Sequence, residues 1–178
     1  MADRRTTLAD AALTVVADHG LKGLTHRAVD REASVPPGTT SNYFRTRAAL
    51  IAAVMDRLEQ RDLEVWAAGG GGTPATTPDE LAQQLARYLG VLAGAHADLA
   101  RTRFSLSIDR PEDVAEGHRR FLALAEHAIA EMGLDDARRR ARWVADYGDG
   151  VLLHQVTARR DELLDVTATA AAIRRLLD

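Results

Sequence analysis

The sequence predicts an all-α protein of about nine helices. Ala, Leu and Val dominate a hydrophobic share of 46%, and they recur at intervals of three and four residues, as in helices that bury one face. No long alternating run of Val, Ile, Thr and aromatic residues indicates a sheet, and there are only five prolines. A chain of 178 residues suits one medium domain or a small domain joined to a larger one.

The first two helices are predicted from apolar spacing and capping residues. The first is expected over residues 3–19, because Gly20 is a natural C-terminal stop. Its apolar residues at helical spacing are Leu8, Ala11, Ala12, Val15 and Val16. The second is expected over residues 25–33, with Thr25 as its N-cap. The side chains expected to face outward from it are His26, Arg27, Asp30 and Arg31.

A third, short helix should begin near Pro37, since proline is tolerated in a first turn, and end near Tyr43. A long helix with a continuous apolar stripe is expected over residues 46–67. The following GGGGTPATTP at 69–78 has the composition of a flexible linker and predicts a disordered surface loop. Four or five amphipathic helices are expected beyond it, with approximate spans of 78–94, 98–108, 111–132, 135–158 and 160–177.

Composition excludes several classes of protein. Without cysteine there are no disulfides, thiolate zinc sites or cysteine nucleophiles. The N-terminus lacks the apolar stretch of a signal peptide, and no apolar run approaches the ~18 residues of a membrane span. A cytoplasmic protein with no membrane partner is therefore expected. Residues 1–61 carry nine Lys/Arg against seven Asp/Glu, whereas the remainder carries fourteen against nineteen, a contrast compatible with DNA binding by the N-terminal part.

Two short helices joined by a tight turn, after a longer helix, form the arrangement of a helix-turn-helix. The second of them must enter the major groove, so its outer face needs short side chains that can approach base edges and phosphates. The residues that meet this requirement are Pro37, Gly38, Thr39, Ser41 and Asn42. Tyr43 offers a hydroxyl to a phosphate, and Arg47 offers a cation with a similar reach.

The stretch from about Arg5 to Val54 resembles the DNA-binding domain of the TetR family of transcriptional regulators. The residues in matching places are Val35, Gly38, Thr39, Tyr43, Phe44, Arg47 and Leu50. The chain departs from the family pattern at Pro36 and Pro37, where Ser-Lys is usual, so the ordinary hydroxyl N-cap is missing. Thr40 replaces a usual leucine and Ser41 a frequent tyrosine.

The resemblance implies roles for individual residues. Arg27 would read a guanine, with a solvated or phosphate-contacting arginine as the alternative. Thr39, Ser41 and Asn42 are candidates for base edges or are spacers. Thr25 would cap its helix and also contact a phosphate. Tyr43 and Arg47 would contact phosphates as well. Phe44 is expected in the core, behind the recognition helix.

The resemblance divides the chain into a DNA-binding domain at 1–47 and a ligand-binding and dimerisation domain at 48–178. Apolar and small residues on the last two helices support a four-helix dimer interface, or else they close the monomer's own core. The predicted interface residues are Gly148, Val151, Leu152, Val166, Ala170, Ile173 and Leu177. The predicted lining of a ligand cavity is Trp66, Tyr88, Arg103, Phe104, His118, Phe121, Trp143 and Tyr147, although aromatics at helical spacing also serve as core.

An enzyme is not expected. DYGDG at 146–150 lacks the spacing of a calcium loop, and the six histidines form no HExxH motif. There is no Gly-rich phosphate loop or nucleophile elbow, so neither a metal nor a cofactor is predicted. The expected function is a homodimeric, ligand-responsive repressor that binds a palindromic double-stranded DNA operator and is released by a small-molecule inducer. The alternative is a ligand-binding helical dimer without sequence-specific DNA binding.

Overall fold

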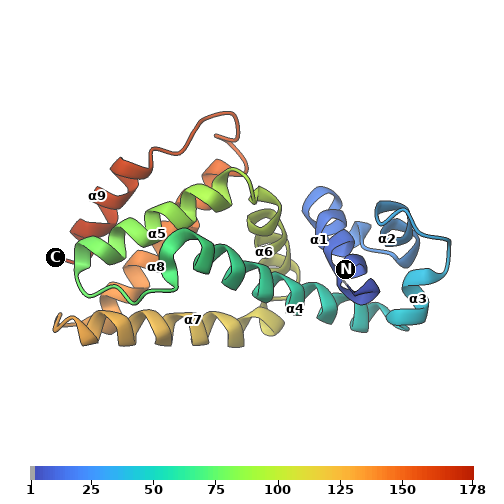
Figure 1. Cartoon of the computed structure of the whole chain (residues 1–178), viewed down its shortest axis with the longest axis horizontal. Coiled ribbons are helices and arrows are strands. Elements are labelled where there is room, and N and C mark those ends of the chain that lie inside the picture. Colours follow the sequence, from blue (N-terminus) through green and yellow to red (C-terminus); the bar gives the residue numbers. More distant parts are fainter. Residues whose placement is uncertain (1–2) are drawn as a thin grey trace. The chain divides into compact units, whose positions relative to one another are not determined.

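A computed structural model describes residues 3–178 of the chain, and over these residues it contains nine α-helices and one π-helical turn, with no strand. The all-α prediction is therefore confirmed (Figure 1). The elements are α1 (Arg4–Gly23), α2 (His26–Glu32), α3 (Thr39–Tyr43), α4 (Arg47–Trp66), η1 (Ala67–Gly71), α5 (Pro78–Ala93), α6 (Ala97–Asp109), α7 (Pro111–Glu131), α8 (Ala137–Gln155) and α9 (Val166–Leu176).

The helices form two compact units. The N-terminal unit runs to Glu64 and also takes in Asp98–Asp109, whereas the C-terminal unit comprises Val65–Ala97 and Arg110–Asp178. The N-terminal unit therefore extends beyond residues 1–47, because α6 packs on the helices that begin the chain. The Thr102 hydroxyl on α6 donates to a main-chain carbonyl of α1, that of Leu13, at 3.2 Å. Arg103 on α6 pairs with Asp62 on α4 at 2.6 Å.

The core of the N-terminal unit is aliphatic, with one aromatic residue. Its fully buried side chains include Leu8, Leu13, Leu24, Phe44 and Leu50, which confirms the prediction for Phe44. The predicted stop of the first helix at Gly20 is confirmed, since Gly20 is non-helical at φ 64° and ψ 178° and a separate short helical stretch follows it to Gly23. Gly20 adopts φ 64°, which is open to glycine without strain, and the chain turns there so that Leu21 is buried.

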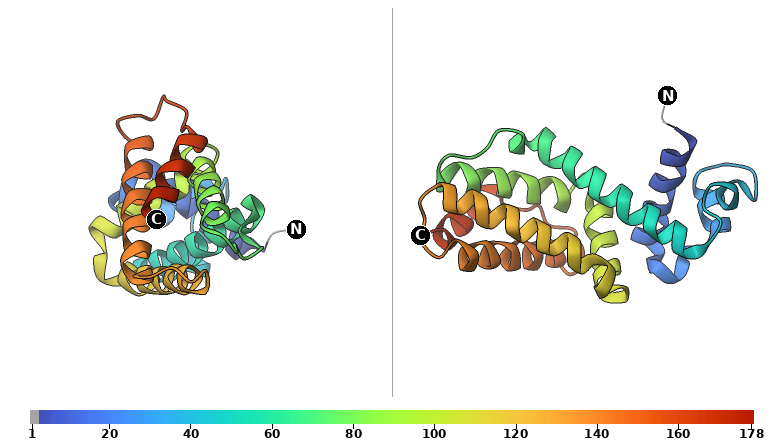
Figure 2. Two further views of the ribbon diagram at one scale, coloured as in Figure 1. Left: turned by 90° about the vertical axis from the view of Figure 1, so that its left-hand side faces the viewer. Right: turned by 90° about the horizontal axis from the view of Figure 1, so that it is seen from below.

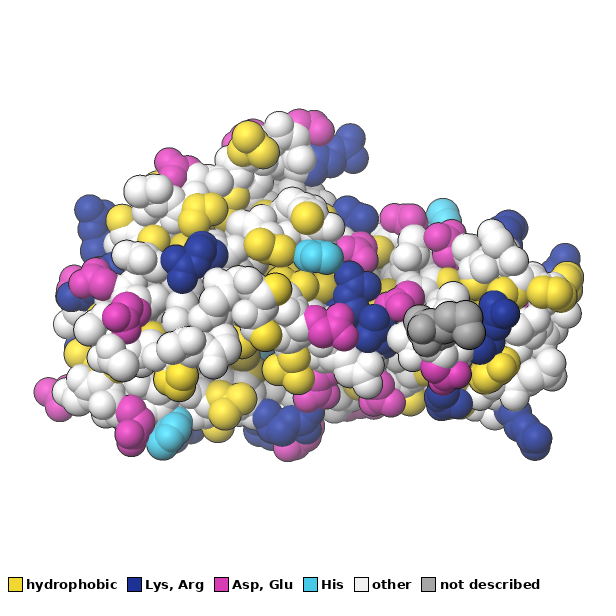
Figure 3. Space-filling view, in the orientation of Figure 1, with side chains coloured by type: hydrophobic (Ala, Val, Ile, Leu, Met, Phe, Trp, Pro, Cys, Tyr) yellow, Lys and Arg dark blue, Asp and Glu magenta, His cyan; other side chains and the backbone are white. Residues whose placement is uncertain are grey.

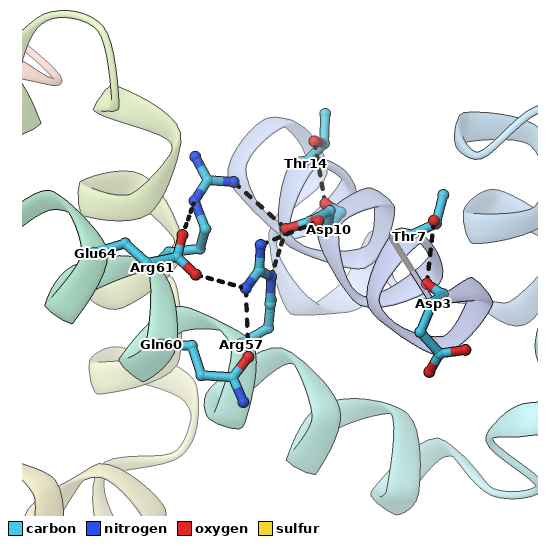
Figure 4. Close-up of polar contacts among 8 residues, drawn as sticks. All are labelled: Asp3, Thr7, Asp10, Thr14, Arg57, Gln60, Arg61 and Glu64. Atoms are coloured by element: carbon cyan, nitrogen blue, oxygen red, sulfur yellow. Dashed lines mark hydrogen bonds and ion pairs between the residues drawn. The ribbon is translucent and has the colours of Figure 1, made fainter. Parts of the chain in front are cut away.

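A polar network on one side of the same unit connects α1 to α4 (Figure 4). Asp10 on α1 accepts from Arg57 at 2.7 Å and from Arg61 at 3.4 Å. Arg57 also donates to Gln60 at 3.3 Å and to Glu64 at 3.2 Å. These contacts fix the register between two helices that are far apart in the sequence.

In the C-terminal unit, α9 lies beside α5 and α7 lies beside α8 (Figures 1 and 2). The close approach of α9 to α5 requires Gly90, because a Cβ atom there would lie 2.9 Å from Cγ2 of Val166. Leu92 on α5, Ile129 on α7, Leu152 on α8 and Ile173 on α9 are fully buried, so all four helices contribute to one core.

The glycine-rich segment is helical in its first part, where a loop was predicted. Its first part continues α4 as the turn η1, with Gly70 at φ 95°. Gly71 lies flat against the indole of Trp66, where a Cβ would come within 2.0 Å of the ring. The Gln84 side chain then donates to the Thr73 carbonyl at 3.0 Å. Gly71 is required because the Trp66 ring leaves no room for a side chain, and Gly70 is required by its positive φ.

The last helix is shorter than the predicted 160–177. It begins at Val166, because the carboxylate of Asp165 accepts from the main-chain N–H of Ala168 at 2.9 Å and caps the helix. The preceding connection leaves Leu163 98% exposed. Over residues 3–178, none of the helices combines the length and the apolar character that a membrane span requires.

Candidate nucleic-acid interface

The helix α2 begins as the sequence predicts. Thr25 is its N-cap, and its hydroxyl oxygen accepts from the main-chain N–H of Ala28 at 3.1 Å. Arg27, in the first turn, is exposed, as predicted for a residue that reaches DNA. The capping role of Thr25 is therefore confirmed, while its phosphate contact stays a prediction.

The recognition helix α3 begins at Thr39, not at Pro37 as predicted. Pro37 lies in the turn before it, and Gly38 occupies the N-cap position at φ 90°. The Thr39 hydroxyl donates to the carbonyl of Pro36 at 2.6 Å, and the Ser41 hydroxyl donates to the carbonyl of Gly38 at 2.8 Å. Both hydroxyl protons are therefore used within the chain, which leaves their oxygens as acceptors toward a base edge.

Asp30 on α2 was expected to face outward, and this was wrong, since only 4% of the residue is exposed. One carboxylate oxygen accepts from the N–H of Gly38 at 2.7 Å. The other accepts from the N–H and the hydroxyl of Thr40, at 2.7 and 2.6 Å. Burial by itself would raise the pKa of Asp30, but these bonds outweigh it and hold the pKa below its ordinary value.

Asp30 thus supplies the cap that the two prolines remove. Thr40 is fully buried, and its hydroxyl bonds to this carboxylate. Asp30 and Thr40 lie ten positions apart, and a buried polar pair of this kind leaves no periodic signal. The one signal in the sequence was a polar residue, Thr40, on the inner side of the recognition helix, since a buried hydroxyl needs a hydrogen-bond partner.

The other end of α3 is held by two basic side chains. His26 Nε2 lies 2.6 Å from the carbonyl oxygen of Phe44, and Arg5 donates to the carbonyl of Tyr43 at 3.3 Å. The Arg5 guanidinium also lies 4.6 Å from the centre of the Phe44 ring. His26 was expected to face outward and is instead half-buried by this contact.

Arg47 does not extend freely into solvent. Its guanidinium donates to the carbonyls of Leu21 and Leu24, at the end of α1. The residue is nevertheless exposed, so a positive charge remains on this surface. Thr46 caps α4 beside it, accepting from the N–H of Ala49 at 3.1 Å.

The outer surface of the helix-turn-helix is polar and carries several cations. Exposed residues on it are Thr25, Arg27, Arg31, Pro37, Gly38, Ser41, Asn42, Tyr43, Arg45 and Arg47. Figure 3 shows Lys and Arg side chains over this end of the N-terminal unit, interspersed with acidic ones. Thr39 is half-buried, and 41% of Tyr43 is exposed.

The eight residues predicted to line a ligand cavity are divided between the two units. Arg103 and Phe104 belong to the N-terminal unit, and Arg103 is paired with Asp62. In the C-terminal unit, Trp66 and Tyr88 meet edge to face, with ring centres 5.5 Å apart. Tyr147 is half-buried.

The remaining three predicted lining residues are exposed on the C-terminal unit. His118 and Phe121 lie on α7, and Trp143 lies on α8 with Arg139 over its ring at 5.0 Å. These three side chains lie on the surface of the single chain, and their place in a ligand site stays a prediction. Two surface hollows of about 580 and 700 Å³ lie between α5 and α9 and between α7 and α8, and of the predicted lining only Trp143 borders one of them.

Four residues predicted at a dimer interface are instead buried in the C-terminal unit. They are Gly148, Leu152, Ile173 and Leu177. Gly148 packs against Leu89 of α5, which brings α8 close to that helix. These four residues belong to the monomer's own core, which was the alternative to a dimer interface. The other three predicted interface residues, Val151, Val166 and Ala170, are half-buried.

Residues 8–54 match the family model described as bacterial regulatory proteins, tetR family. No curated protein sequence matches the chain. A solved member of the TetR family from Streptomyces coelicolor A3 is 28% identical, with a TM-score of 0.75, and the match covers 99% of both chains. A TetR-like transcriptional regulator from Rhodococcus sp. RHA1 is 21% identical, with a TM-score of 0.76 over 96% of this chain and 91% of that chain, and this likeness shows the fold.

The multidrug binding protein EbrR is similar over the whole length as well. Its complex with ethidium is 27% identical to this chain, with a TM-score of 0.68 over 98% of both chains. EbrR has also been solved with malachite green and with proflavin.

Proposed function

We propose that this chain is a regulator of the tetR family, a repressor that binds a palindromic operator as a homodimer and is released by a small-molecule inducer. The single observation that carries the proposal is the family match over residues 8–54, which spans the exposed polar face of α3. A ligand-responsive DNA-binding regulator follows from the family and from the similar structures.

The outer face of the helix-turn-helix is assigned to DNA. Arg27 and Asn42 have free reach toward base edges, and the hydroxyl oxygens of Thr39 and Ser41 act there as acceptors. Tyr43 and Thr25 contact phosphates. Pro37 and Gly38 carry no long side chain, which lets the turn approach the backbone of the duplex. Arg47 adds positive charge near a phosphate while it holds the end of α1.

A homodimer places two recognition helices about one helical turn of DNA apart, ~34–36 Å. An outward stripe on α8 supports such an interface, with Trp143 46% and Leu153 44% exposed and Gly150 between them. A Cβ on Gly150 would meet nothing within 4 Å inside the chain, so this glycine leaves space for a second helix. Val151, Val166 and Ala170 then lie at the edge of the interface.

The dimer is tested by sedimentation of a variant on this stripe. Leu153→Glu introduces a charge into the proposed interface and is expected to give monomers at concentrations where the unmodified protein is dimeric. Leu163→Glu is the matched control, because Leu163 is more exposed and lies off α8. Dimers of equal stability for both variants would place the interface elsewhere.

The ligands of EbrR suggest the class of inducer. Ethidium, malachite green and proflavin share flat aromatic rings and positive charge. The Trp66–Tyr88 pair offers ring faces and edges to such a molecule.

Release from DNA is a shift between two states of the dimer. The ligand-free state holds the spacing that matches the operator, and ligand favours a state in which α4 has swung and the spacing is wider. A ligand shifts this equilibrium only by the difference between its affinities for the two states. Equal operator affinity with and without the inducer would contradict this mechanism.

DNA binding is tested by selecting duplexes from a random pool with the unmodified protein. We expect enrichment of a palindromic sequence, and lower affinity for it in the presence of ethidium or proflavin. Failure to enrich any sequence would favour the alternative, a ligand-binding helical dimer without sequence-specific DNA binding. Because these dyes bind DNA themselves, the ligand site needs a DNA-free measurement.

Tryptophan fluorescence provides that measurement, since the chain has two tryptophans, Trp66 and Trp143. Titration with malachite green is expected to quench emission from Trp66. Trp143→Phe should therefore retain most of the quenching, and Trp66→Phe should lose it. The reverse result would move the site to the surface of α8.

A further inference from the structure

We propose that Asp30 is a positioning residue for DNA recognition, whose buried carboxylate sets the orientation of α3 and thereby the discrimination between DNA sequences. This inference rests on the proposed DNA-binding function. Asp30 lies on α2 and is almost entirely shielded from solvent, so it acts on DNA through the helix that it holds.

The three bonds to Asp30 occupy both carboxylate oxygens. The donors are two main-chain N–H groups and one hydroxyl, from Gly38 and Thr40, all at 2.6–2.7 Å. An ionised carboxylate is the side-chain group that can accept at both oxygens without presenting a donor. Bonds of this kind are stronger than those between neutral groups, so the start of α3 is firmly tied to α2.

A five-residue helix cannot hold its own position. One helical turn is unstable by itself, because its nucleation fixes several dihedral angles for one hydrogen bond. The local sequence offers little help at the N-terminal end, where Pro36 and Pro37 have no N–H and Gly38 has no side chain. The orientation of α3 therefore comes from contacts with other helices.

Those contacts differ at the two ends. Phe44 is fully buried, and His26 and Arg5 bond to the carbonyls that follow α3, so the C-terminal end is held by packing and by two side chains. The N-terminal end is held by Asp30. Loss of Asp30 alone therefore frees the end that carries Thr39 and Ser41 and leaves the rest of the domain folded.

Base readout and phosphate contact respond differently to such a change. Hydrogen bonds to base edges require a fixed position, whereas attraction to phosphates is a property of the charged surface and is insensitive to sequence. A loosened α3 therefore loses affinity for the preferred sequence while its affinity for unrelated DNA stays the same. A residue that only stabilises the fold would change both affinities together.

Asp30→Asn is the informative variant, because it keeps the shape but turns an N–H₂ group toward a main-chain donor or the Thr40 hydroxyl. The probes are the duplex that the unmodified protein selects from a random pool and a scrambled duplex of the same length. At one salt concentration, we expect affinity for the selected duplex to fall about tenfold or more, the effect of losing one good base contact. Affinity for the scrambled duplex should change by no more than about twofold.

Thr40→Val is the matched control, since it removes the hydroxyl donor and leaves both main-chain bonds to Asp30. Its loss of discrimination should be smaller than that of Asp30→Asn. Amide hydrogen exchange without DNA gives a second readout: the N–H groups of Gly38 and Thr40 should exchange faster in Asp30→Asn, while those of α1 and α4 are unchanged.

The proposal is overturned if the ratio of the two affinities is the same in Asp30→Asn as in the unmodified protein, whether both affinities are unchanged or both fall by the same factor. Failure of the unmodified protein to select any sequence is a distinct result, which removes the DNA-binding function and the role of Asp30 with it.

Discussion

The Arg57 guanidinium on α4 donates to both carboxylate oxygens of Asp10 on α1, at 2.7 and 3.3 Å. The Arg57 side chain is 14% exposed and that of Asp10 is 36% exposed, so water screens the pair only in part. The hydrogen bond to Asp10 raises the pKa of Arg57, and the Asp10 and Glu64 charges add to it against the opposing effect of burial. Arg57 therefore carries a positive charge at neutral pH.

Arg57→Met is expected to destabilise the N-terminal unit by about 1–2 kcal/mol, the value of hydrogen bonds to a charged group after partial screening. Arg57→Lys keeps the charge but cannot span both oxygens, so its loss should be intermediate. Urea unfolding monitored by circular dichroism measures both. Stabilities equal to that of the unmodified protein would show that the network contributes nothing.

Thr25 and Thr77 are matched caps at the start of α2 and α5, with hydroxyl oxygens that accept from main-chain N–H groups at 3.1 and 3.2 Å. Thr25→Ala and Thr77→Ala should each cost about 1 kcal/mol of stability. Only Thr25→Ala should also weaken DNA binding in a gel-shift titration, because Thr25 is assigned to a phosphate. Equal DNA affinities for the two variants would remove that assignment.

Asp30 makes stability depend on pH. The pKa of Asp30 is lower in the folded protein than the ordinary value of 3.8. Between these two pKa values the unfolded chain binds a proton that the folded chain does not, so the free energy of unfolding decreases as the pH is lowered. The contribution is fully present above about pH 5 and is lost as the pH falls through the folded pKa. Urea unfolding from pH 3 to 6 should show a gap between the unmodified protein and Asp30→Asn that narrows below about pH 4. A gap independent of pH would contradict the ionised state of Asp30.

Gly90 and Gly117 are both helical glycines, but only Gly90 faces a close neighbour. Gly90→Ala pushes its Cβ into Val166, and we expect a net destabilisation of about 1 kcal/mol, or a melting temperature lower by ~2–4 °C. Gly117→Ala, whose Cβ meets only the end of Arg120 at 3.9 Å, should stabilise α7 by about 0.5–1 kcal/mol. Calorimetry of the two variants should therefore give shifts of opposite sign.

Local patterns in the sequence determined the number of helices, most of their bounds and the helix-turn-helix. Apolar spacing, the N-cap at Thr25 and the burial of Phe44 depend on neighbours within a few residues, and the structure agrees with them. The exposed residues of the recognition helix were predicted for the same reason, since contact with DNA demands short polar side chains on an outer face.

Only the tertiary structure decided which polar residues turn inward. Asp30 is buried because its acceptors meet donors of α3, and Arg47 holds α1 because the carbonyls of Leu21 and Leu24 lie within its reach. Gly71 has no room for a side chain because the Trp66 ring lies against it, and Leu152 and Ile173 are core because α8 and α9 pack within their own unit. Each outcome depends on a partner distant in the sequence, and the energy of such a pair is absent from any local pattern.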